Sequence, residues 1–180
     1  MSIDDTIKMF IIFYLLKLSK LSNYLDLYYP LTFHYIYSFI NTGDFMKYKP
    51  PSVLLVEDDP QHAESIKAML ERVHEFDFVL KHCYKLQEGL KILKNNEFDV
   101  ILLDLGLPDS AGFETFQSIH QQATKIPIVI FTSLFDEEIA LKTLRSGAQE
   151  YLFKGEYDGQ DLVTAINHSI ARMKFEASND

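Results

Sequence analysis

The sequence has few of the features that mark several large classes of protein. A single cysteine, Cys83, is present among 180 residues, so an internal disulfide is excluded and a reducing, cytoplasmic location is expected. Positive charge is scarce: the formal net charge is −9, which argues against nucleic-acid binding by electrostatic attraction. A purely apolar run, Met9 to Leu16, is too short to span a bilayer. No internal repeat or low-complexity segment is present.

Residues 1–49 differ from the rest of the chain. They hold twelve of its 24 Phe and Tyr residues, and their second apolar stretch, 31–40, is also short. Asp4 and Asp5 stand where a secretory signal carries positive charge, and no small-residue cleavage site follows the first apolar run. Membrane contact is therefore expected, if at all, through residues 1–45.

Three interpretations of this aromatic-rich extension stay open. It is an amphipathic segment on a membrane surface, a helical appendage that packs on the domain or on a partner, or a segment that is not translated. Translation from Met46 is favoured, because Met46 directly precedes a short lead into the domain at 50–180. Mass spectrometry of the native N-terminus would decide between these.

From residue 50 onward, apolar runs of strand type alternate with helical patterns. Continuous runs rich in β-branched residues are typical of parallel strands covered on both faces. This alternation predicts an α/β fold, a doubly wound five-stranded parallel sheet with helices on both faces. The predicted strands are 53–56, about 78–84, 99–104, 126–131 and 151–153. The predicted helices are 60–73, 86 to about 95, one marked by Phe113, Phe116 and Ile119, one stopped by Gly147, and one marked by Leu162 through Met173.

Three acidic residues follow two of these strands. Glu57 and Asp58 come after the first strand and Asp104 after the third, and parallel strands deliver their carboxyl ends to the same edge. Three carboxylates in one cleft repel one another unless a cation lies between them, and hard oxygen ligands suit Mg²⁺. The plainer interpretation makes Asp59 and Pro60 an ordinary helix cap, with neighbouring acids of no special role.

Two further side chains are expected at the same edge. Thr132 ends the fourth strand and Lys154 follows the fifth. Each alone is usually structural or solvated, but together with the acids they meet the needs of phosphoryl transfer to a carboxylate. One carboxylate acts as nucleophile, a metal neutralises charge, and the lysine and hydroxyl hold the phosphoryl oxygens.

Residues 52–175 resemble the response-regulator receiver domain of two-component signalling, which has a flavodoxin-like fold. The resemblance rests on four motifs in order: VLLVEDDP (53–60), ILLDLGLP (101–108), VIFTS (129–133) and YLFK (151–154). It implies a stand-alone response regulator, since few residues follow the last predicted helix. Such a protein receives phosphate from a sensor histidine kinase or a histidine phosphotransfer protein and signals by docking to an output protein. It is not an enzyme beyond its own phosphorylation and dephosphorylation.

The resemblance also assigns roles to single residues. Asp104 would be the phosphoacceptor. Asp58, Asp104 and the backbone carbonyl of Gly106 would bind Mg²⁺ directly, and Glu57 would act through a metal-bound water. The sequence departs from many relatives at Gly155, where they carry proline after the lysine.

The remaining implied roles concern switching and lifetime. Thr132 and Lys154 would hold the phosphoryl group, and Tyr151 would turn inward when Thr132 moves. Gly106 and Leu134 occupy positions that help place the hydrolytic water in this family, and neither side chain can hydrogen-bond. Slow loss of phosphate is therefore expected.

Two other classes of protein share part of this residue pattern. A pseudo-receiver, acting as a phosphorylation-independent protein-binding module, is disfavoured by the intact set of acids, threonine and lysine. A haloacid-dehalogenase-like phosphatase needs an aspartate two residues after the nucleophile, where this chain has Gly106.

Overall fold

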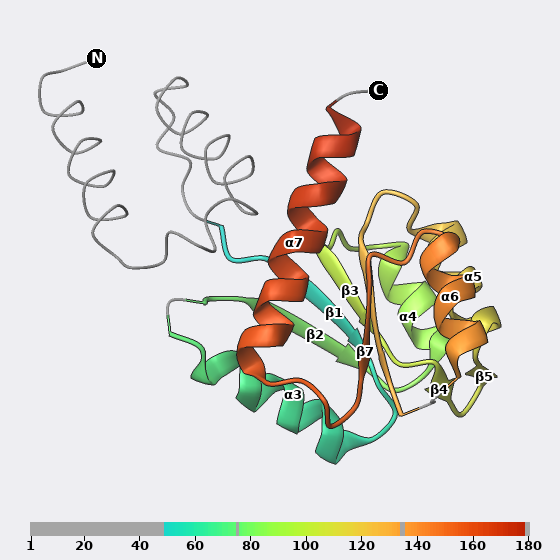
Figure 1. Ribbon diagram of the computed structural model, residues 1–180, viewed down its shortest axis with the longest axis horizontal. Coiled ribbons are helices and arrows are strands. Elements are labelled where there is room, and N and C mark those ends of the chain that lie inside the picture. Colours follow the sequence, from blue (N-terminus) through green and yellow to red (C-terminus); the bar gives the residue numbers. More distant parts are fainter. Residues whose placement is uncertain (1–48, 75, 134–135, 179–180) are drawn as a thin grey trace, which may run out of the picture. The chain divides into compact units, whose positions relative to one another are not determined.

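A five-stranded parallel sheet forms the centre of the domain. The computed structural model describes residues 49–180 except 75, 134–135 and 179–180. The strand order is β2-β1-β3-β6-β7, which confirms the predicted doubly wound architecture (Figure 1). The strands are β1 (Ser52–Val56), β2 (Val79–Cys83), β3 (Val100–Leu103), β6 (Ile128–Thr132) and β7 (Glu150–Phe153).

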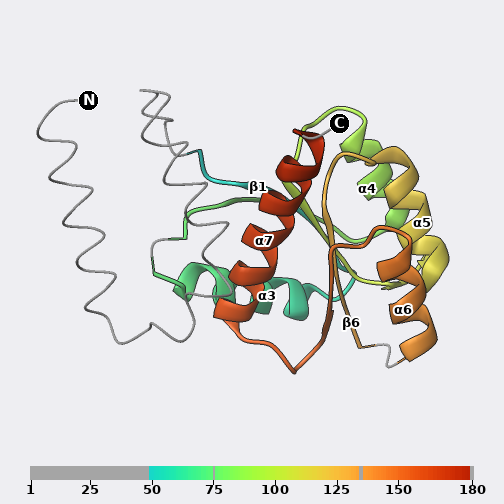
Figure 2. The same cartoon turned by 45° about the horizontal axis from the view of Figure 1, so that its top comes forward.

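Five helices cover the two faces of the sheet. They are α3 (Pro60–Arg72), α4 (Leu86–Leu93), α5 (Phe113–Gln122), α6 (Glu137–Arg145) and α7 (Gly159–Ala177). Helices α3 and α7 pack on one face, and α4, α5 and α6 on the other (Figures 1 and 2). Layers on both sides explain why the three central strands, β1, β3 and β6, are almost entirely apolar.

The alternation of side chains along β1 divides the core in two. Val53 and Leu55 pack with α3 and α7, whereas Leu54 and Val56 pack with α4 and α5. All four side chains are fully buried. Because strand side chains alternate between faces, a shift by one residue would exchange the two sets, so packing specifies the register.

Acidic caps determine where three helices begin. Asp59 accepts hydrogen bonds from the first turn of α3, with Pro60 at the first helical position, as predicted. Asp136 caps α6 in the same way. Asp158 and Asp161 form a reciprocal capping box at the start of α7.

The segment after β3 is more ordered than its composition suggests. Residues 106–111, between the third predicted strand and the third predicted helix, form a small antiparallel hairpin of β4 (Gly106–Leu107) and β5 (Ser110–Ala111). In its turn, the Asp109 carboxylate accepts the backbone N–H groups of Leu86 and Gln87 at 2.9 and 3.0 Å. This carboxylate from a distant turn therefore caps α4, whose own N-cap residue provides no side-chain bond.

The predictions made for residues 1–48 lie outside the described residues. Within the part of the chain that the structure describes, no helix is both long enough and apolar enough to cross a membrane. Both halves of the described core are built from residues at or after Val53.

We expect a fragment of residues 46–180 to fold without the preceding segment, because its five strands and five helices bury a core of their own. Thermal unfolding followed by circular dichroism should show one cooperative transition. A fragment that aggregates or melts without cooperativity would instead show that the aromatic-rich segment is needed for folding.

Candidate functional site

Strand register places two of the predicted acids side by side. In the pairing of β1 with β3, Val56 lies opposite Leu103, and the Asp104 N–H donates to the Val56 carbonyl at 2.9 Å. Glu57 and Asp104 are the next residues on their strands. The chain leaves β1 toward β2 on one side and β3 lies on the other, so the pair stands where ligands bind in open α/β sheets.

Glu57, Asp58 and Asp104 form one group of carboxylates. Each provides an oxygen, and these oxygens all lie within 4.8 Å of one another. Glu57 and Asp104 are buried, at 0% and 3% exposure, whereas Asp58 is exposed. Two buried acids beside an accessible one suit a hard cation that keeps part of its water shell, so the donor set fits Mg²⁺.

Lys154 lies between the two buried carboxylates. Its Nζ is 2.7 Å from Oε2 of Glu57 and 2.6 Å from Oδ2 of Asp104. The backbone positions it, because the Lys154 N–H donates to the Thr132 carbonyl at 3.0 Å where β6 and β7 end. We call these four residues (Glu57, Asp58, Asp104 and Lys154) the acid–lysine cluster.

The pKa shifts of Glu57 and Lys154 show that their contacts favour the charged form of each side chain. Burial alone would raise the pKa of Glu57, but hydrogen bonds from His62, Lys154 and the Asp59 amide outweigh it and lower the pKa. Burial would lower the pKa of Lys154, and bonds to Asp104 and Glu57 raise it instead. Glu57 therefore stabilises the folded state at pH values above 4.5, its ordinary pKa. This stabilisation is lost as the pH falls through the lower pKa that Glu57 has in the folded protein. Lys154 stabilises the folded state at pH values below 10.5, its ordinary pKa. This stabilisation is lost as the pH rises through the higher pKa that Lys154 has in the folded protein.

Thr132 and Gly106 lie at the same edge of the sheet, and Tyr151 lies within β7. Thr132 ends β6 and is 1% exposed. The Gly106 N–H donates to Oδ1 of Asp104 at 3.0 Å. Tyr151 pairs with Ile130 and so shares a sheet face with Thr132, two residues further along β6. Burial, then the charges of Asp136 and Asp104, raises the pKa of Tyr151.

Two further positions named from the sequence are Gly155 and Leu134. Gly155 has a φ of 89°, a left-handed conformation that proline cannot adopt, so the loop after Lys154 differs from that of proline-bearing relatives. Leu134 lies outside the described residues.

Two residues that contact the cluster, His62 and His82, and a third that contacts His62 were not identified from the sequence. His62 Nδ1 lies 2.6 Å from Oε2 of Glu57, and the Tyr157 hydroxyl lies 3.3 Å from His62 Nε2. His82 Nε2 lies 2.7 Å from the Glu57 carbonyl oxygen. One signal was available: His62 is three residues after the Asp59 cap, so it belongs to the first helical turn beside the strand end. Nothing in the sequence indicates the Tyr157 contact, which joins residues 95 positions apart.

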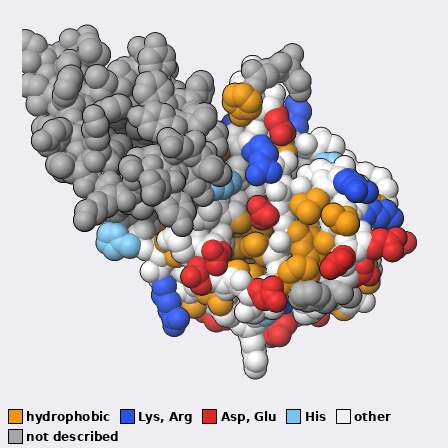
Figure 3. All heavy atoms as spheres, in the orientation of Figure 1, with side chains coloured by type: hydrophobic (Ala, Val, Ile, Leu, Met, Phe, Trp, Pro, Cys, Tyr) orange, Lys and Arg blue, Asp and Glu red, His pale blue; other side chains and the backbone are white. Residues whose placement is uncertain are grey.

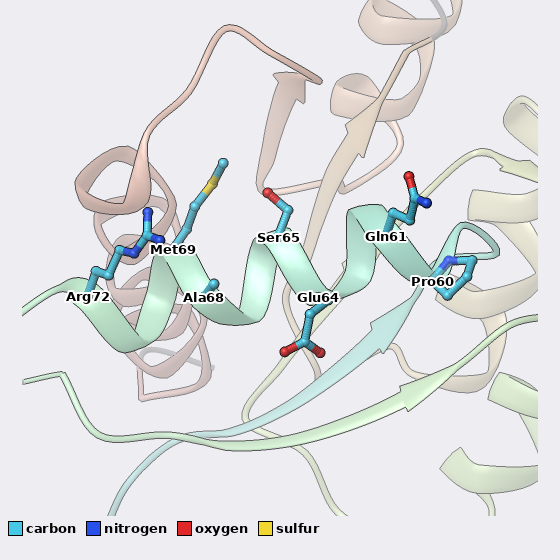
Figure 4. A pocket seen from close by; sticks show the side chains of 7 residues that line it. All are labelled: Pro60, Gln61, Glu64, Ser65, Ala68, Met69 and Arg72. Carbon is cyan, nitrogen blue, oxygen red and sulfur yellow. The ribbon is translucent and has the colours of Figure 1, made fainter.

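The described surface carries a group of acidic side chains (Figure 3) and, along α3, a shallow hollow. Acidic side chains gather along the lower edge of the described domain in Figure 3. The hollow runs along the exposed side of α3 and is lined by Pro60, Gln61, Glu64, Ser65, Ala68, Met69 and Arg72 (Figure 4). Its lining contains no member of the acid–lysine cluster, so we place the chemistry at the strand ends.

Comparison with known proteins gives consistent matches. Residues 53–167 match the family described as the response regulator receiver domain. The cell cycle response regulator CtrA of Brucella ovis is 32% identical over 131 residues, which cover 71% of this chain and 53% of that protein. The chain thus spans about half the length of the curated relatives it matches.

Solved structures agree on the fold. The CheY-like receiver domain protein from Methanospirillum hungatei has 25% identity and a TM-score of 0.63, covering 71% of this chain and 99% of that one. A receiver domain protein from Clostridium thermocellum has 28% identity and a TM-score of 0.61, covering 69% and 98%.

We expect Lys154→Met to destabilise the protein by about 3 kcal/mol or more, because it leaves Glu57 and Asp104 buried without their shared cation. Urea unfolding at neutral pH measures the change. Lys125→Met, at an exposed position, is the matched control and should stay within about 0.5 kcal/mol of wild type. Equal stability of the two variants would contradict the arrangement described.

Proposed function

The chain belongs to the response regulator receiver domain family, and on that premise we propose that Asp104 accepts a phosphoryl group from a histidine kinase or a histidine phosphotransfer protein. Receiver domains are signalling modules that interact with such proteins and with output domains. The observation that carries the assignment is the 2.6 Å contact between Asp104 Oδ2, at the end of β3, and Lys154 Nζ, beside two further acids at the end of β1.

The proposed reaction transfers the phosphoryl group from nitrogen to oxygen. A carboxylate oxygen of Asp104 forms a bond to phosphorus while the bond between phosphorus and the donor imidazole nitrogen breaks. The released imidazole keeps the electron pair of that bond and takes up a proton from water. Lys154, now paired with Asp104, is close enough to turn its ammonium to a phosphoryl oxygen, where new negative charge must be held.

A divalent cation completes the proposed site. Glu57, Asp58 and Asp104 would hold it, Asp58 and Asp104 directly with the Gly106 carbonyl, and Glu57 through water. When bound, Mg²⁺ supplies positive charge that offsets the phosphoryl oxygens and the crowded acids. Lys154 alone provides one positive charge against three carboxylates, which supports a need for further cationic charge.

The proposed signal passes from Thr132 to Tyr151. Thr132 would hold a phosphoryl oxygen through its hydroxyl, and Tyr151, on the same sheet face and partly buried, would turn inward as Thr132 moves. We further propose that the domain acts alone and docks to an output protein through α6, β7 and α7. The rival function is a pseudo-receiver that binds its partner without phosphate.

We expect Asp104→Asn to abolish phosphorylation while the fold survives, because the nucleophile is lost and Lys154 keeps Glu57 as a partner. Incubation with acetyl phosphate and Mg²⁺, followed by intact-mass spectrometry, is the test. Asp59→Asn, which preserves a good helix cap, is the control and should still gain one phosphoryl group. Wild-type protein that gains no phosphate would favour the pseudo-receiver.

We expect Mg²⁺ to raise the melting temperature, since a ligand bound by the folded state adds about 2.7 kcal/mol at a hundredfold excess over its dissociation constant. Asp58→Ala should remove this effect at little intrinsic cost, because Asp58 is exposed. Glu64→Ala, an exposed change on α3, serves as control. An equal Mg²⁺ response in Asp58→Ala would rule out the proposed ligand set.

A further inference from the structure

Two histidines hold Glu57 in place. His82 lies 2.7 Å from its backbone carbonyl oxygen, and the Glu57 N–H donates to the Cys83 carbonyl at 3.0 Å, so the backbone is held from the β2 side. His62 Nδ1 lies 2.6 Å from its side-chain Oε2. The Asp59 N–H reaches the other oxygen, Oε1, at 3.1 Å.

His62 is itself held on several sides. Its Nε2 lies 3.3 Å from the Tyr157 hydroxyl, and its ring packs at 5.6 Å from the buried ring of Phe131. Burial and the charges of Glu57 and Asp104 raise the pKa of Tyr157, so the phenol keeps its proton and can donate it to Nε2. A bond from Tyr157 to Nε2 leaves the ring proton on Nδ1, pointing at Glu57.

The contacts form a continuous chain from the loop after β7 to Asp104. Tyr157 lies in that loop and contacts His62, in the first turn of α3. Oε2 of Glu57 contacts both His62 and Lys154. Lys154 in turn reaches Asp104. If Lys154 leaves Glu57 for a phosphoryl oxygen, His62 remains as a side-chain donor to this fully buried carboxylate. An unpartnered buried carboxylate would be costly and would reorient.

We propose that His62, supported by Tyr157, is a positioning residue that orients the Glu57 carboxylate for cation binding and frees Lys154 to leave it. The proposal rests on the proposed function for the identity of the cation. Partners that orient metal-site groups commonly influence affinity by 10- to 100-fold.

Calorimetric titration with Mg²⁺ alone is the test, on the full chain. His62→Ala should weaken binding by roughly tenfold, and Tyr157→Phe by less. His62→Asn should restore most of the affinity, because its amide nitrogen is as many bonds from the backbone as Nδ1. Gln61→Ala, an exposed neighbour in the hollow of Figure 4, is the control and should match wild type.

The outcomes separate this inference from the proposed function. Equal affinity of His62→Ala and wild type overturns it, and so does equal weakening by His62→Ala and His62→Asn, which would indicate lost packing rather than a lost hydrogen bond. Wild type that binds no Mg²⁺ overturns it too. Wild type that binds Mg²⁺ but accepts no phosphate overturns the proposed function and leaves only the role of His62 in cation binding standing. In metal-free protein, nitrogen-15 spectra should show a protected proton on Nδ1 of His62 that is lost in Glu57→Ala.

Discussion

The crowding of three carboxylates around one ammonium group is the constraint on which the rest of the site depends. Lys154 touches Glu57 and Asp104 at 2.7 and 2.6 Å, and Asp58 adds a third negative charge at the rim. Both buried acids are stabilised by hydrogen bonds, yet the cluster keeps an excess of negative charge. Such crowding favours the binding of a cation, and under the proposed function the site presents the Asp104 carboxylate to an electrophile.

The fold produces this crowding through strand register and helix capping. Parallel pairing places Glu57 next to Asp104 and brings Lys154 to the end of β6. The central strands β1, β3 and β6 are buried on both faces, so a slip in register by one residue would exchange the side chains packed on the two faces. The Asp59 cap begins α3 at the point that turns His62 back toward Glu57. The packing of the sheet thereby holds the Glu57 and Asp104 carboxylates close together, although their like charges repel.

Much of this was predictable because it depends on local pattern and on strand topology. The alternation of strands and helices predicted the sheet, and three strand ends predicted that Glu57, Asp104 and Lys154 meet. The hydrogen bonds around Glu57 were not predictable, because His62 and His82 reach it, and Tyr157 reaches His62, through side-chain directions and loop geometry that no periodicity encodes. The capping of α4 by Asp109 was missed for the same reason: its partner residues lie more than twenty positions away.

The most direct test of the central claim is a crystal structure of the protein with Mg²⁺ and beryllofluoride, a mimic of the phosphoryl group. The account predicts beryllium bonded to an oxygen of Asp104, with Lys154 Nζ moved from its position between the two carboxylates to a fluorine atom. It also predicts Mg²⁺ against Asp58 and Asp104, with His62 still bonded to Glu57. Beryllofluoride bound elsewhere, or Lys154 unmoved between Glu57 and Asp104, would contradict it.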